Sequence, residues 1–208
     1  MCHADVKASL EATAKLCAKL GHEIVPIENP INGDEFINTF LTIWASSPAD
    51  LVTMAKSMNL KPEEVLEPWT IGLAKLFNSK PKDSLEKALK YFDKVEQQMA
   101  DFFGGYDVWL TPVLSAPAPK IGEQAPTVDF DTLYQRTVDY VAYTPVHNVA
   151  GTPAISVPLG MSKDGLPIGS QFAAAKGNDA MLLALAYELE AAAPWIDRHP
   201  PVYVGGRR

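Results

Sequence analysis

The residue types of a serine hydrolase triad occur in the second half of the chain. Ser156, His147 and either Asp139 or Asp164 could supply a nucleophile, a base and an orienting carboxylate, if the base lies within hydrogen-bond reach of the serine. No G-x-S-x-G turn exposes Ser156, which lies in the apolar run 154–159, where its hydroxyl is expected to bond a neighbouring backbone group. We expect His147 to be a structural histidine, and we predict no catalytic residue in this chain.

The other candidate nucleophiles and ligands are weaker. Ser46 and Ser47 are adjacent but precede Pro48 between helix-forming residues, which is typical of a helix break rather than of a nucleophile. No glycine-rich phosphate loop is present, so we expect no nucleotide cofactor. We also expect no metal site, because the remaining histidines stand alone without ligand spacing: His3, His22 and His199.

Two turn-rich segments could line a binding pocket. The first, 111–113 (TPV), ends a predicted strand, and ligands of open α/β sheets gather outside the carboxyl ends of strands. The second, 148–153 (NVAGTP), holds a glycine that can adopt a positive φ ahead of a proline, which lets backbone approach a ligand. A purely structural role as rigid turns stays open. The predicted pocket-wall residues are Thr111, Pro112, Val113, Asn148, Gly151 and Thr152.

The elements that would position these residues predict an α/β fold, with a mixed sheet covered by helices. A D-G pair at 164–165 predicts a tight turn between the last two strands, and Pro158 predicts that its strand ends, bulges or lies at an edge there. Asp83 is expected to cap its helix. The predicted strands are 22–27, 107–111, 154–159 and 168–175, and the predicted helices are 5–20, 33–58 in two pieces broken at 46–48, 62–77, 83–103, 129–143 and 179–193.

Composition limits the class of protein. With 208 residues, of which 47% are hydrophobic, the chain can form a real core. The net charge of −7 argues against a nucleic-acid partner. No apolar run approaches the roughly 20 residues of a membrane span, and no leader opens the chain. Two cysteines without ligand spacing fit a reducing compartment, so we expect a cytoplasmic protein that binds no membrane.

Several motifs together resemble one known family. Two runs are similar to the closing segment of the amidase signature family: N-x-A-G-x-P-A-I-S-V-P-x-G over 148–160 and D-G-L-P-I-G-x-Q over 164–171. Members of this family are serine hydrolases of carbon–nitrogen bonds. The resemblance extends to 106–112 (YDVWLTP) and 116–122 (APAPKIG). It implies that residues 1–208 are one partial domain, the C-terminal portion of the amidase signature fold, with a helical section at about 33–103.

The resemblance also implies how the chain would act. The family uses a nucleophilic serine, a second serine and a lysine from an upstream segment rich in glycine and serine, and no such segment occurs here. We therefore expect an amidase portion whose catalytic residues come from an N-terminal part. The substrate would be a small amide, and the chain would associate with itself or with that N-terminal half. The alternative is a non-catalytic fragment or pseudoenzyme that binds a partner or an amide.

One position bears on the substrate. The family branch that takes ammonia from glutamine to amidate transfer RNA has an aspartate, suited to bind ammonium, where Val141 aligns. Valine cannot bind ammonium, so the resemblance implies a less polar amide.

Overall fold

The predicted D-G turn joins two strands of the sheet in the computed structural model, which describes residues 2–200 and 202–204. Strand β2 (Ala154–Met161) and strand β3 (Pro167–Ala174) pair antiparallel. Gly165 in the turn has a φ of 78°, and its N–H donates to the carbonyl of Ser162 at 3.0 Å. A glycine takes this left-handed conformation without the steric penalty that a side chain would meet, so the D-G prediction is confirmed.

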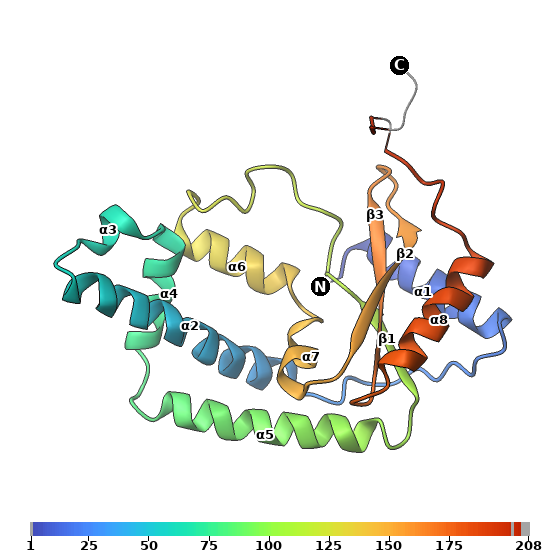
Figure 1. Ribbon diagram of the computed structural model, residues 1–208, viewed down its shortest axis with the longest axis horizontal. Coiled ribbons are helices and arrows are strands. Elements are labelled where there is room, and N and C mark those ends of the chain that lie inside the picture. Colours follow the sequence, from blue (N-terminus) through green and yellow to red (C-terminus); the bar gives the residue numbers. More distant parts are fainter. Residues whose placement is uncertain (1, 201, 205–208) are drawn as a thin grey trace.

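The third strand completes a small antiparallel sheet. Strand β1 (Val108–Pro112) pairs with β3, which gives the order β1-β3-β2 with β3 in the centre (Figure 1). The register of β2 shifts between Val157 and Gly160. Pro158 lies at this irregularity and has no N–H to donate to the ladder, so the predicted bulge is confirmed.

The predicted strand 22–27 is wrong as a strand of this sheet. This segment joins the first two helices without strand structure, and each residue from 21 to 29 is exposed. A strand is held by a ladder of backbone hydrogen bonds, and the described residues give this segment no ladder partner. The predicted α/β class is confirmed, but the sheet has three strands instead of four and is antiparallel rather than mixed.

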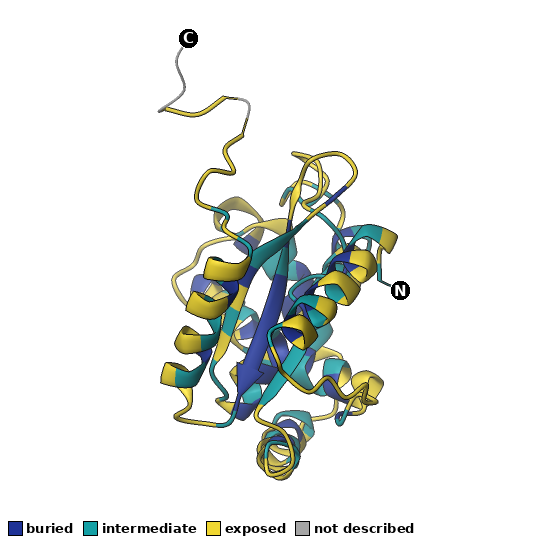
Figure 2. Ribbon diagram, turned by 90° about the vertical axis from the view of Figure 1, so that its right-hand side faces the viewer, coloured by how far each residue is buried: buried dark blue, intermediate teal, exposed yellow. Residues whose placement is uncertain are grey.

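Helices α1 (Ala4–Lys19) and α8 (Asp179–Ala192) cover one face of the sheet. In Figure 2 they lie side by side in front of it, with buried strand β3 visible between them. Both helices pack apolar side chains against the sheet, and Gly21 follows α1 with a φ of 100°. The buried residues of this core are Cys17, Val157, Phe172, Ala174, Leu182 and Leu189.

The helical section packs beside the other face. Helix α5 (Ser84–Phe102) and helix α7 (Pro145–Ala150) share a second core with the start of α2 (Gly33–Ser57). Its buried residues are Ile31, Phe36, Val95, Met99, Val146 and Ala150. On α5, Val95 and Met99 are fully buried in this core, whereas Leu89 is 52% exposed. Asp83 occupies the N-cap position of α5 as predicted, but its side chain makes no capping hydrogen bond and pairs instead with Lys87 at 2.7 Å.

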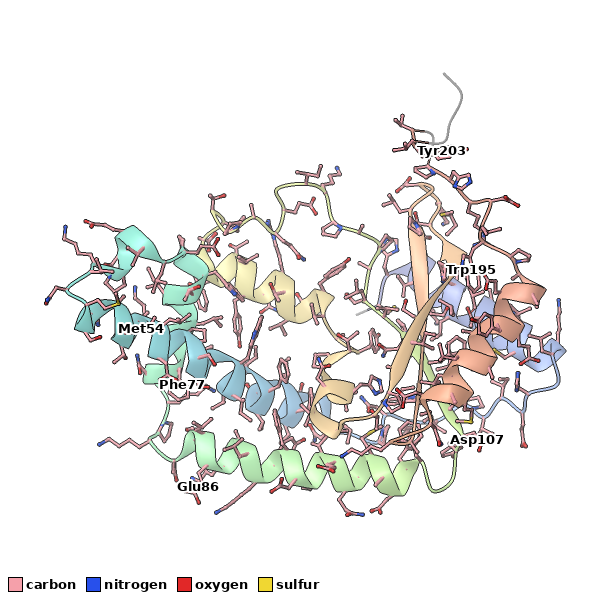
Figure 3. All side chains as sticks on the ribbon, viewed as in Figure 1. Met54, Phe77, Glu86, Asp107, Trp195 and Tyr203 are labelled. Atoms are coloured by element: carbon pink, nitrogen blue, oxygen red, sulfur yellow. The ribbon has the colours of Figure 1, made fainter. Side chains whose placement is uncertain are left out.

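Helix α2 is continuous where two helices were predicted. Pro48 lies inside it, although proline removes a helical hydrogen bond and usually kinks or breaks a helix. The hydroxyl of Ser46 donates to the carbonyl of Ile43 at 2.7 Å, and both α4 and α5 pack against α2. Tertiary packing therefore overrides the local break. The helix continues to Met54 and beyond, far from the sheet (Figure 3).

Two other predicted helices differ in the structure. The predicted helix 62–77 is α3 (Pro62–Val65) followed by α4 (Pro68–Asn78), because the residue before a proline avoids the helical region. Glu67 accordingly has a ψ of 150°. The predicted helix 129–143 ends at Tyr140 as α6 (Phe130–Tyr140), and the unpredicted helix α7 begins at Pro145.

Candidate functional site

A cavity of about 470 Å³ lies beside the carboxyl end of β1. Four separate segments line it: the start of α1, the connection into α2, strand β1, and the end of α6 with the start of α7. Most of the wall is apolar, as in small-molecule sites generally. The lining side chains include Leu10, Ile27, Ile31, Phe36, Ile37, Trp109, Thr111, Pro112, Val138, Val141, Tyr143 and Val146.

A few polar groups face this cavity. Cys2 and Lys7 come from the N-terminal end of the chain and Tyr143 from the loop between α6 and α7. The pKa of Tyr143 is raised, mainly because burial disfavours the phenolate and further because the Cys2 thiol lies against it. The phenol therefore stays protonated at neutral pH and can act as a hydrogen-bond donor.

The first predicted pocket segment lies at this cavity. Thr111 and Pro112 line it, and Gln171 on β3 donates from Nε2 to Thr111 Oγ1 at 3.0 Å. Thr111 is 7% exposed and Gln171 4%, so this cross-strand pair fixes the hydroxyl in a buried position. Val113 is not part of the cavity wall. It packs where a Cβ on Gly169 would approach to 2.9 Å.

The second predicted pocket segment lies elsewhere. Asn148, Gly151 and Thr152 do not line the cavity. Asn148 is exposed in α7, and Gly151 ends that helix with a φ of 65°, which is the positive φ predicted for it. Thr152 Oγ1 lies 2.9 Å from His147 Nδ1. This part of the segment forms a helix end with a hydrogen-bonded histidine.

His147 is a buried group with one bonded nitrogen. It is 5% exposed, and its Nε2 has no hydrogen-bond partner. Its ring meets Trp109 edge to face at 5.7 Å between centroids. Burial lowers the pKa of His147 to about 4, so the imidazole is neutral at pH 7. His147 itself does not line the cavity, but its ring contacts Trp109, which does.

The residues considered for a catalytic triad make no hydrogen bond with one another within the described part of the chain. They are Ser156, His147, Asp139 and Asp164. Ser156 is exposed on β2, and the carboxylate of Asp139 accepts from Gln135 at 2.9 Å. The Nδ1 of His147 is engaged by Thr152. These contacts leave Ser156 without a base. Residues 2–200 and 202–204 also contain no cluster of three His, Cys, Asp or Glu side chains that could hold a metal ion.

Sequence reasoning missed most of the cavity wall. Val141 was singled out from the sequence and does line the cavity, but Cys2, Lys7 and Tyr143 were not predicted. They show no regular spacing in the sequence and meet only because α1 packs across the sheet near β1.

None of the described helices is long and apolar enough to cross a membrane.

Comparisons with known proteins agree on one family. The family model described as Amidase matches residues 1–183. The protein named "Putative amidase AmiC" of Mycobacterium leprae (strain TN) is 36% identical over 196 residues, which cover 93% of this chain and 42% of that protein. The 6-aminohexanoate-cyclic-dimer hydrolase of Pseudomonas sp. (strain NK87) is 31% identical over 218 residues, which cover 98% of this chain and 43% of that protein.

Solved structures give the same result. A 6-aminohexanoate cyclic dimer hydrolase complexed with substrate superposes with a TM-score of 0.80 and 25% identity, covering 96% of this chain and 44% of that one. A glutamyl-tRNA(Gln) amidotransferase polypeptide of Thermotoga maritima superposes with a TM-score of 0.67 and 28% identity, covering 93% of this chain and 40% of that one. The chain thus spans about two fifths of the length of the relatives it matches. With a family match over residues 1–183, this chain belongs to the amidase signature family.

Proposed function

We propose that this chain is the C-terminal portion of an enzyme that hydrolyses carbon–nitrogen amide bonds. The observation that carries the proposal is the cavity of about 470 Å³ beside β1, whose mostly apolar wall with a few polar groups is typical of small-molecule sites. Its apolar wall would hold the substrate, and Thr111, held by Gln171, and the protonated Tyr143 would bond the amide.

The nucleophile and base would come from a polypeptide portion upstream of this one. Amide hydrolysis by the family proceeds through acyl transfer to a serine and then to water. Within the described residues Ser156 has no base, while the relatives named above extend well beyond the part that this chain matches. The role of this chain would be to bind and orient the amide beside that serine.

The substrate we infer has an apolar body. Val141, Val138 and Phe36 face the cavity, and an ammonium group among these side chains would lose its hydration without gaining a carboxylate partner. An aliphatic or aryl amide would bury its carbon chain there instead. Hydrolases of apolar amides therefore fit this wall better than an enzyme that channels ammonia from glutamine.

Assay of the purified chain tests where the nucleophile lies. We expect no release of ammonia from a short aliphatic or an aromatic amide above the buffer rate, because loss of a nucleophile and its base removes nearly all catalysis. Ser156→Ala serves as the matched variant. Turnover by the wild-type chain that disappears in Ser156→Ala would place the nucleophile in this chain and overturn the proposal.

A further inference from the structure

The polar groups in the wall of the cavity beside β1 are mainly hydrogen-bond donors. The wall includes the side chains of Lys7, Asn29, Thr111 and Tyr143. Lysine offers three N–H donors and no acceptor, and a protonated tyrosine offers one O–H. No Asp or Glu lies among the described residues that line the cavity. A ligand for this wall must therefore supply acceptors, and it meets a positive charge without a negative one.

Two side-chain oxygens of this wall that could act as acceptors are already engaged. Asn29 Oδ1 accepts from the backbone N–H of Ile31 at 3.0 Å, so the Nδ2 amino group of Asn29 is the part left for a ligand. Thr111 Oγ1 accepts from Gln171 Nε2 at 3.0 Å, which leaves the hydroxyl hydrogen to be donated. Hydrogen bonds inside the protein thus use these oxygens and leave the donors.

Lys7 is the one charged side chain among the described lining residues. No ion pair joins it to a carboxylate within residues 2–200 and 202–204. Lys7 and Asn29 are exposed, whereas Thr111 is 7% exposed, so the first two lie at the open rim of the cavity and Thr111 at its inner side. A charged group bound at the rim keeps part of its hydration, so its desolvation costs little.

We infer that the substrate is an amide whose apolar body ends in a carboxylate, and that Lys7, with Asn29, binds this carboxylate at the rim of the cavity. The inference rests on the function proposed above, in which Thr111 and Tyr143 bond the amide. The carboxylate accepts hydrogen bonds from both rim side chains, and the charge on Lys7 strengthens them. The apolar wall holds the carbon chain between the two polar ends. Monoamides of dicarboxylic acids have this chemistry.

The charge of the whole chain works against an anionic ligand. The net charge is −7, so the long-range field of the protein attracts cations. A preference for an anion must therefore come from the groups beside the cavity. The sign of the preference thus tests the local role of Lys7.

Three amides of equal chain length test the inference with the purified chain. Hexanamide is neutral, the monoamide of adipic acid is anionic at neutral pH, and 6-aminohexanamide is cationic. Binding is followed by NMR titration of the indole N–H of Trp109, which lines the cavity. Trp195 packs in the core between the sheet and helices α1 and α8, so its indole signal is the internal reference.

Lys7→Gln removes the charge at the rim, Lys7→Glu reverses it, and Lys15→Gln is the matched control. Lys15 is an exposed residue of the same helix that does not line the cavity. We expect the wild type to bind the adipic monoamide about fivefold more tightly than hexanamide, the upper end of the scale for an exposed ion pair, and to bind 6-aminohexanamide most weakly. Lys7→Gln should lose this preference, Lys7→Glu should favour the cation, and Lys15→Gln should match the wild type.

Three results would overturn the inference. The first is equal affinity of the wild type for the anionic and the neutral amide. The second is a preference for the anion that survives in Lys7→Gln or disappears in Lys15→Gln. The third is a Trp109 signal that none of the three amides shifts.

Binding and catalysis remain separable in this design. The catalytic test uses the complex of this chain with the portion of Mycobacterium leprae AmiC that precedes the matched region. A complex that prefers to bind the anionic amide but hydrolyses none of the three would contradict the proposed function and leave the role of Lys7 intact. A complex that hydrolyses hexanamide as well as the adipic monoamide, with equal affinity for both, would contradict the role of Lys7 alone.

Discussion

Acidification should destabilise this chain through His147. The imidazole is buried, its Nε2 has no partner, and its Nδ1 lies 2.9 Å from Thr152 Oγ1. Protonation would place a charge among Trp109 and other apolar groups, where burial opposes it. The pKa of His147 is consequently about 4 in the folded chain, against 6.5 for an unperturbed histidine.

The sign and size of the effect follow from this difference. Because the folded-state pKa lies below the unfolded one, the stabilising contribution is complete above pH 6.5 and is lost as the pH falls towards 4. Linkage between these two pKa values lowers the free energy of unfolding by about 2 kcal/mol between pH 7.5 and pH 5.0. This is a large share of the stability of a domain of this size.

Urea unfolding at pH 7.5 and pH 5.0 measures the effect, with His147→Gln as the matched variant. Glutamine keeps a polar group near Thr152 but cannot titrate. The carboxylates titrate in both proteins, so the difference between their pH dependences isolates the histidine. The wild type should lose about 2 kcal/mol more than His147→Gln over this interval. Parallel losses in the two proteins would refute the assignment of His147 as a buried neutral group.

Two further predictions concern single positions. Gly151 has a φ of 65°, so Gly151→Val should lower the free energy of unfolding by more than about 1 kcal/mol. Gly151→Asn should lower it less, because asparagine tolerates this conformation. Equal losses for the two variants in urea titrations would contradict the backbone argument. Ser9 Oγ is buried without a partner, so Ser9→Ala should be neutral or stabilising. The Oγ of Ser170 is 2.7 Å from Thr13 Oγ1, and Ser170 is 1% exposed. Thr13→Val should therefore destabilise the chain by about 1–3 kcal/mol, because it leaves the Ser170 hydroxyl unpaired. Thermal melts in which Ser9→Ala and Thr13→Val lose stability equally would show that the two hydroxyls do not differ.

The elements that sequence reasoning predicted well are those with a strong local signal. The D-G pair specified the turn at Gly165, and Pro158 specified the irregularity in β2. The predicted bounds of the helices that became α1, α5 and α8 agree with the structure to within about one residue at each end. In each case, residues close in sequence determine the conformation.

The errors arose where distant contacts decide. Pro48 was expected to divide a helix, but α4 and α5 pack against α2 and hold it continuous. Residues 22–27 have strand propensity, yet strand structure requires a partner that the described residues do not supply. The cavity combines Cys2 with Tyr143 across most of the chain, which no spacing in the sequence reveals. Of the residues that sequence reasoning singled out, only Thr111, Pro112 and Val141 line the cavity.

The central claim is that this chain forms an amidase when it is joined by an upstream portion that carries the nucleophile. The most direct measurement is amide hydrolysis by the complex of this chain with the upstream portion of Mycobacterium leprae AmiC, compared with each component alone. We predict turnover of an apolar amide such as hexanamide by the complex and none by either component. A complex that forms but shows no turnover, or turnover by this chain alone, would contradict the account.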